Sequence, residues 1–294
     1  MNSSNVLCKK KIEVNQMQSK DIFKSLKNDY FLQKLFNNLL RKKSLDIIKY
    51  NKNIKDRINI TIKDYKEYSE IYSQIELEIK PANKIYGKFI KINEENKMYY
   101  HIYFNDNKEE IKRNYLKINE QIETIKIIID YQVKSFKELF YFCECIESLK
   151  FIKFYRNNIT NMEGMFSFCS SLKKLNLSNI NTQNVTNMGF MFSYCSSLKE
   201  LNLSNFNTQN ITNMGFMFSY CSLLKELNLS NFNTNNVTNM SSMFYECSSV
   251  KELNLSNFNT QNVTNMAGMF SGCSDGFKMK IKSLYKNIDK EAFD

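Results

Sequence analysis

The sequence of 294 residues contains no tryptophan, one proline, one histidine and seven glycines. So little proline and glycine excludes a collagen-like chain and a low-complexity linker. The one histidine, His101, lies in a predicted strand, which argues against the Ser/His and Cys/His pairs of nucleophilic catalysis. Glycine-rich phosphate loops of the G-x-x-x-x-G-K-[ST] and G-x-G-x-x-G types are absent too. We therefore expect a protein that is not an enzyme and needs no cofactor or metal.

Long apolar runs are also missing. No stretch approaches the roughly 20 apolar residues that a membrane-spanning helix needs. The first residues, MNSSNVLCKKKIEVNQMQ, have no apolar centre of the kind found in secretory signals. A cytoplasmic protein is the expectation from this pattern, and a cell-surface protein is the alternative.

The charge is basic but uneven. The chain has a formal net charge of +11, yet residues 159–276 hold five lysines against six acidic residues. A basic N-terminal half can contact nucleic acid, and aromatic and basic residues interleave between Tyr86 and Phe104 as in single-strand binders. A solvated β-hairpin has the same composition. We therefore expect no nucleic-acid partner.

A repeat of about 26 residues dominates the second half of the chain. Cysteine recurs at this spacing six times, and phenylalanine recurs in a parallel column three residues earlier. Repeats of this length indicate a stacked architecture, in which each unit buries its apolar side chains against its neighbours. The two columns are Cys143, Cys169, Cys195, Cys221, Cys247 and Cys273, and Phe140, Phe166, Phe192, Phe218, Phe244 and Phe270.

Each repeat divides into two parts. Leu201 and Leu203 alternate around Asn202, which is the periodicity of a strand with one buried face. Met217 and Cys221 follow at helical spacing and predict a short helical turn. A strand and a short helix within a unit of this length are typical of leucine-rich repeats.

The unit resembles the BspA-like leucine-rich repeats of bacterial surface proteins. The family pattern L-x-L-S-N-F-[DN]-T-x-N-V-T-N-M-x-x-M-F-x-x-C-x-x-L is matched from Leu201 to Leu224 and from Leu227 to Val250. The resemblance implies a solenoid with a binding or adhesive role. We therefore predict an α+β chain whose residues 133–287 form a solenoid of about six rungs with a parallel sheet, followed by a tail, 288–294. The last strand is expected at Met279–Leu284.

Any ligand should meet the outward positions of the predicted strands. In consecutive rungs these carry asparagine, serine and, in three rungs, glutamate, beside a column of lysines. A polar solvated face is one interpretation, and a concave face for a protein or peptide ligand is the other. The candidate ligand-binding residues are Asn176, Asn202, Asn228, Asn254, Ser204, Ser230, Glu200, Glu226 and Glu252.

The cysteine column allows disulfides, metal ligands or buried thiols. Side chains one rung apart point the same way, which suits a disulfide poorly. Cysteines separated by a whole repeat do not have the close spacing of zinc ligands. Because free cysteine is among the most buried residue types, we predict structural thiols.

Two further regions precede the repeats. Residues 1–58 are predicted to be helical, and Leu32, Leu35, Phe36 and Leu39, followed by Leu45 and Ile48, resemble the apolar pattern of an F-box. Residues 59–132 are predicted to be β-rich, with strands at 85–92, 98–104 and 125–129, the last of which could cover the first rung. We therefore predict a non-enzymatic module that binds protein or peptide. An F-box-like adaptor of a ubiquitin ligase and a surface adhesin are the alternatives.

Overall fold

The computed structural model describes residues 62–294, so the predicted F-box positions lie outside the described residues. The chain divides into two compact units, and the boundary between them in the sequence falls between Tyr72 and Ser73. Helix α5 (Ile62–Tyr72) belongs to the first unit, and the region predicted to be β-rich therefore begins with a helix. The following paragraphs concern the second unit, Ser73–Asp294.

A five-stranded sheet opens the second unit, in the order β3-β5-β1-β6-β7. Strands β1 (Ile75–Pro81), β3 (Tyr100–Phe104) and β5 (Ile125–Ile129) are antiparallel to their neighbours and alternate buried and less buried side chains. Strand β6 (Ile146–Lys153) pairs with β1 on one side and, in parallel, with β7 (Lys174–Asn176) on the other. The sheet thus joins the β-rich region to the first repeats.

The predicted strand at 85–92 is wrong. The structure has only the short strand β2 (Gly87–Lys88), which pairs with β4 (Tyr115–Leu116). The consecutive side chains of Phe89 and Ile90 are both fully buried, and a strand with one buried face cannot bury two neighbours. The 3₁₀ helix η1 (Glu94–Tyr99) then leads into β3. The strand beside β6 is β1, and the predicted cover, β5, lies one strand further out.

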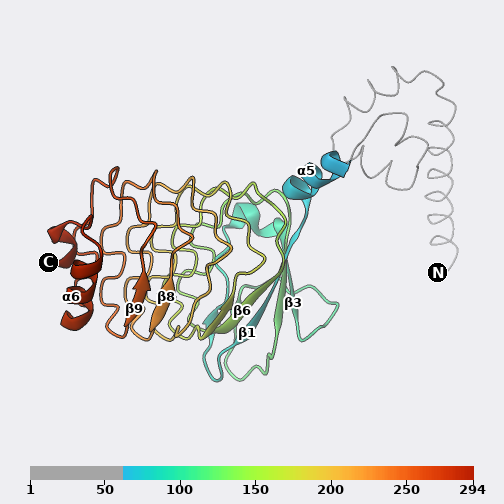
Figure 1. Cartoon of the computed structure of the whole chain (residues 1–294). Coiled ribbons are helices and arrows are strands. Elements are labelled where there is room, and N and C mark those ends of the chain that lie inside the picture. Colours follow the sequence, from blue (N-terminus) through green and yellow to red (C-terminus); the bar gives the residue numbers. More distant parts are fainter. Residues whose placement is uncertain (1–61) are drawn as a thin grey trace, which may run out of the picture. The chain divides into compact units, whose positions relative to one another are not determined.

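Residues 133–274, here called the repeat array, are joined by backbone hydrogen bonds one repeat apart. The amide of Phe166 donates to the carbonyl of Met191, and the amide of Phe192 donates to that of Met217, both at 2.9 Å. Parallel bridges link the equivalent asparagines of successive repeats, from Asn161 to Asn265. Figure 1 shows the successive repeats side by side in chain order. The continuous backbone ladder therefore follows the turn in which a methionine directly precedes the buried phenylalanine, as in Met191-Phe192 and Met217-Phe218.

The Leu-x-Leu segments, on another edge of the array, are paired less regularly than the continuous ladder. Strand β7 and the pair β8 (Glu226–Asn228) and β9 (Glu252–Asn254) are three residues long, and the corresponding segment 200–202 is not a strand. Met217–Cys221 forms turns rather than a helix. No helix in the described residues is long and apolar enough to cross a membrane.

The core of the array is a column of stacked rings with a column of thiols beside it. The buried phenylalanines from Phe140 to Phe270 stack in register, and their ring centroids lie 5.3–5.7 Å apart. Each thiol from Cys169 to Cys273 donates to the carbonyl of the phenylalanine one rung earlier, at 3.0–3.2 Å. The thiols are buried and free, so they act as small apolar groups that also satisfy a buried carbonyl.

The last predicted strand is wrong, because Met279–Leu284 belongs to helix α6 (Asp275–Leu284). The hydroxyl of Ser274 caps its first turn by accepting from the amide of Phe277. Phe277 and Ile281, four residues apart, are buried, whereas Met279 is exposed. The helical spacing of the buried residues and the N-terminal cap therefore explain why this segment forms a helix and not a strand.

Helix α6 and the 3₁₀ helix η2 (Lys290–Phe293) cover the end of the array. The amides of Gly268 and Phe270 donate to the carbonyls of Glu291 and Ala292. The ring of Phe293 stacks on that of Phe270 at 5.3 Å and extends the phenylalanine column by one position. The C-terminal segment thus replaces a further rung.

Candidate functional site

A shallow groove of about 850 Å³ runs across the Leu-x-Leu edge of the array and ends at α6. Its residues come from four consecutive repeats and from the helix. They are Lys173, Lys174, Leu175, Glu200, Leu201, Asn202, Glu226, Leu227, Asn228, Glu252, Leu253, Asn254, Lys280, Leu284 and Tyr285.

Strand alternation builds the surface of the groove. Leu201, Leu227 and Leu253 point inward and are between 4% and 9% exposed, so they form an apolar floor. The glutamate before each leucine and the asparagine after it point outward. The repeat therefore presents the same three side chains at each of three rungs.

The outward asparagines are partly used by their own turns. The side-chain oxygen of Asn202 accepts from the amide of Ser204 at 3.0 Å, and Asn228 does the same with Ser230. This is an Asx turn, which bends the chain at the end of the strand segment. The amide nitrogen of each asparagine remains as the donor that the groove can offer to a ligand.

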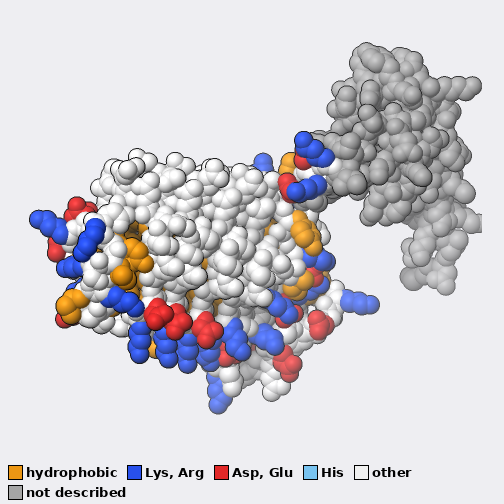
Figure 2. All heavy atoms as spheres, viewed as in Figure 1, with side chains coloured by type: hydrophobic (Ala, Val, Ile, Leu, Met, Phe, Trp, Pro, Cys, Tyr) orange, Lys and Arg blue, Asp and Glu red, His pale blue; other side chains and the backbone are white. Residues whose placement is uncertain are grey.

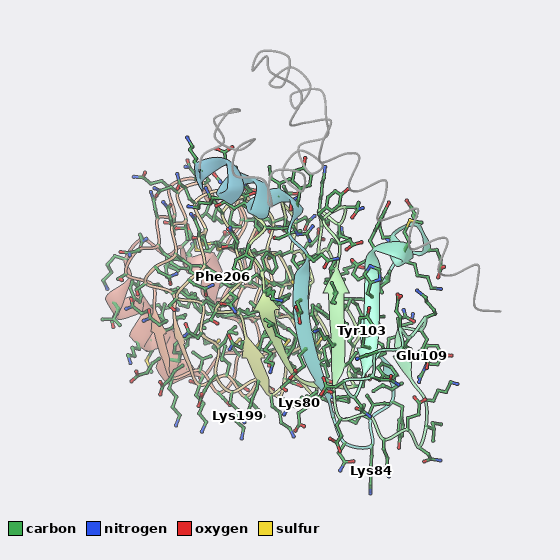
Figure 3. The ribbon with its side chains drawn as sticks, turned by 90° about the vertical axis from the view of Figure 1, so that its right-hand side faces the viewer. Lys80, Lys84, Tyr103, Glu109, Lys199 and Phe206 are labelled. Atoms are coloured by element: carbon green, nitrogen blue, oxygen red, sulfur yellow. The ribbon has the colours of Figure 1, made fainter. Side chains whose placement is uncertain are left out.

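The glutamates form a row of three carboxylates along the groove. Within the part of the chain that the structure describes, no ion pair joins Glu200, Glu226 or Glu252 to a basic side chain. Figure 2 shows acidic and basic side chains gathered along the lower border of the array. Lys199 lies at this border in Figure 3, whereas Phe206 lies within the array. Among the residues that line the groove, those of the three central rungs therefore include acidic groups and no basic ones.

Lysines occupy the two ends of the groove. Lys174 stands one rung before Glu200, in the same column, and Lys280 projects from α6 at the other end. Lys173 is also at the first end, where it forms an ion pair of 2.8 Å with Glu147. The charge along the groove thus changes from basic to acidic and back to basic.

Comparison with protein families identifies the repeats. The family described as "Mycoplasma protein of unknown function, DUF285" matches residues 134–228 and again residues 195–290. The two matches together cover more than half of the chain. The protein belongs to the DUF285 family. Two overlapping matches agree with a chain built from repeats. The search of curated proteins found no match, and the search of solved structures found none either.

The DUF285 region brings most of the predicted binding residues together. Six of the nine line the groove. Asn176 is exposed but lies outside it, and Ser204 and Ser230 stand beyond the floor, where their amides close the Asx turns. Sequence reasoning missed Lys280, Leu284 and Tyr285, which belong to α6 and its C-terminal end. The Ser274–Asp275 cap signal before Phe277 could have revealed this helix.

A second surface feature of the DUF285 array was not predicted at all. Aromatic residues in successive rungs stack on one another, with ring centroids 4.2 Å apart, although their backbones have φ between 56° and 61°. A bulky residue is strained in this region, and glycine takes the same column at Gly272. The stacked side chains are Phe142, Phe168, Tyr194 and Tyr220.

The buried thiols of the DUF285 array are chemically protected. Burial raises the pKa of Cys195 and of Cys221 well above the ordinary thiol value of 9.0. No group of metal-binding side chains occurs among residues 62–294. Since the thiolate is the reactive form, burial keeps these cysteines in the less reactive thiol form.

Proposed function

We propose that the repeat array is a BspA-like leucine-rich-type solenoid that binds a protein or peptide segment without chemical conversion. The observation that carries this proposal is the groove, which spans four repeats and combines an apolar floor with repeated outward donors and acceptors. A rung repeats about every 4.8 Å, so the groove is long and narrow and suits an extended chain.

The chemistry of the groove supports binding rather than catalysis. The described groove residues include no histidine or cysteine, and each carboxylate stands between the same lysine and leucine in the sequence of its own rung. Catalysis by paired acids and bases relies on environments that differ, because the two groups must hold different protonation states. A surface that repeats the same side chains at each rung is instead suited to making the same contact several times along a bound chain.

The test is selection of peptides by the full-length chain. A phage-displayed library of random peptides is panned on the protein, and selected peptides are measured against two variants. Asn228→Trp fills the groove, whereas Gln209→Trp places the same ring on an exposed site outside it. We expect at least a tenfold loss of binding in the first variant and less than a twofold change in the second. Equal binding to both variants would remove the groove from the function, and a library without enriched peptides would contradict the proposal.

A further inference from the structure

We infer that the groove selects an extended peptide segment with two cationic side chains at its centre and no cationic side chains at its ends. This inference rests on the proposed function and adds the chemistry of the partner. It is carried by the shape of the groove and by the order of charges along it.

The length of the groove sets the length of the segment. From the rung of Lys174 to α6 there are four steps of about 4.8 Å, or roughly 19 Å. An extended chain rises about 3.3 Å per residue, so about six residues fill this length. The wall at the far end is made by Leu284, which is 57% exposed, and Tyr285.

The carboxylate row fixes where the cations lie. Glu200, Glu226 and Glu252 are exposed, occupy three successive rungs and therefore span about 10 Å. Alternate side chains of an extended peptide point to the same face about 6.7 Å apart. Two cations separated by one residue can thus each sit between two of the three carboxylates.

The lysines at the two ends of the groove disfavour a peptide that carries its cationic side chains at its ends. A cation at either end of the segment would approach Lys174 or Lys280, and like charges in close contact weaken binding. A purely cationic segment is therefore disfavoured as well, because only the central three rungs are acidic.

The lysine column that precedes the glutamates lies outside the groove. Lys199, Lys225 and Lys251 precede the three glutamates, but none of them lines the groove. Among the described residues, no ion pair joins a lysine of this column to one of the three glutamates. Substitution of these three lysines therefore serves as a control for substitution of the three glutamates, because the lysines belong to the same rungs but carry the opposite charge and lie outside the groove.

The experiment uses fluorescein-labelled peptides and the full-length chain, with binding measured by fluorescence anisotropy at low salt. The first peptide alternates valine and threonine, with two central lysines separated by one threonine. The second has the same composition but carries its lysines at the ends, and a third has central glutamates. We expect the first to bind at least tenfold more tightly than the other two, and its affinity to fall as salt is raised.

Two triple variants locate the binding. Replacing Glu200, Glu226 and Glu252 by glutamine should weaken the first peptide at least tenfold. Replacing Lys199, Lys225 and Lys251 by glutamine should weaken it less than twofold. Equal binding of the central and terminal lysine peptides, or an equal effect of both triple variants, would overturn the inference. Peptides from the random library that depend on the groove but lack central cations would overturn it too, while leaving the proposed function intact.

Discussion

At the scale of single residues, the asparagine side chains in two columns of the repeat have different hydrogen-bonding roles. The Asn202 and Asn228 side chains accept a hydrogen bond, whereas the Nδ2 groups of Asn205 and Asn231 donate across the rungs. The Asn231 amide contacts the carbonyls of Leu203 at 3.1 Å and Phe206 at 3.2 Å. An aspartate can replace the acceptor but not the donor.

This difference gives a paired prediction. Asn231→Asp should lower the free energy of unfolding by about 1–3 kcal/mol, because it removes a donor and sets a carboxylate against carbonyl oxygens. Asn228→Asp should change it by less than about 0.5 kcal/mol, because the Asx turn keeps its acceptor. Urea unfolding of both variants measures the difference, and similar losses would show that the two columns are equivalent.

The buried thiols predict how stability depends on pH. Burial raises the pKa of Cys195, Cys221 and Cys247 in the folded chain above the ordinary value of 9.0. Their contribution is complete below pH 9.0 and is lost as pH rises, because only the unfolded thiols ionise. Each adds a loss of about 1.4 kcal/mol per pH unit above that value. The melting temperature of the native chain should therefore fall more steeply above pH 9 than that of a variant with serine at the three positions. Parallel curves would refute this.

At the scale of elements, the stacked aromatic side chains from Phe142 to Tyr220 show two opposing effects on stability. Ring stacking stabilises the array, and the strained backbone destabilises it. Tyr194 stacks on Phe168 and on Tyr220, and each pair contributes about 0.5–1.5 kcal/mol. Its left-handed backbone costs about 1–2 kcal/mol. The two effects nearly cancel.

Two substitutions at Tyr194 separate these effects. Tyr194→Gly removes both stacking and strain and should shift stability by no more than about 1 kcal/mol. Tyr194→Val keeps the strain, loses the stacking and should cost about 2–4 kcal/mol. Thermal unfolding gives both values, and a glycine variant as unstable as the valine variant would mean that strain is negligible here.

The C-terminal cap shows where sequence reasoning reached its limit at this scale. The columns of buried Leu, Phe, Met and Cys were readable because each rung repeats the same packing. Met279, Ile281 and Leu284 fall into the strand columns by position alone, and a helix places only Ile281 of the three in the core. The outward residues of the groove could be predicted from strand alternation. The residues of its end wall could not, because they come from α6, which was not predicted to be a helix. The strained aromatic turns had no local signal, because glycine occupies this column in only one repeat.

At the scale of the whole molecule, the array has two different ends. Strand β1 covers β6 at the first end, and α6 with η2 covers the last rung at the other. The hydroxyl of Tyr285 accepts from the amide of Leu255 at 3.1 Å, so it satisfies an edge that another rung would otherwise pair. Exposed edges of this kind promote association between chains.

Removal of residues 275–294 should therefore produce oligomers. Size-exclusion chromatography with light scattering would show species larger than the parent chain, increasing with protein concentration. Tyr285→Phe, which loses one hydroxyl and keeps the helix, should elute as the parent does. A truncated chain that elutes with the oligomeric state of the parent would show that the cap has no such protective role.

The near-identity of the rungs makes length an adjustable trait of this molecule. Each rung contacts only its neighbours, so gain or loss of one whole repeat between Asn187 and Asn239 leaves both ends unchanged. Each such gain or loss changes the chain by one whole repeat and keeps every column of the array in register. Each event would lengthen or shorten the groove by one rung, about 4.8 Å, and add or remove one carboxylate. Lineages could thus alter the reach of the surface in discrete steps without a new fold.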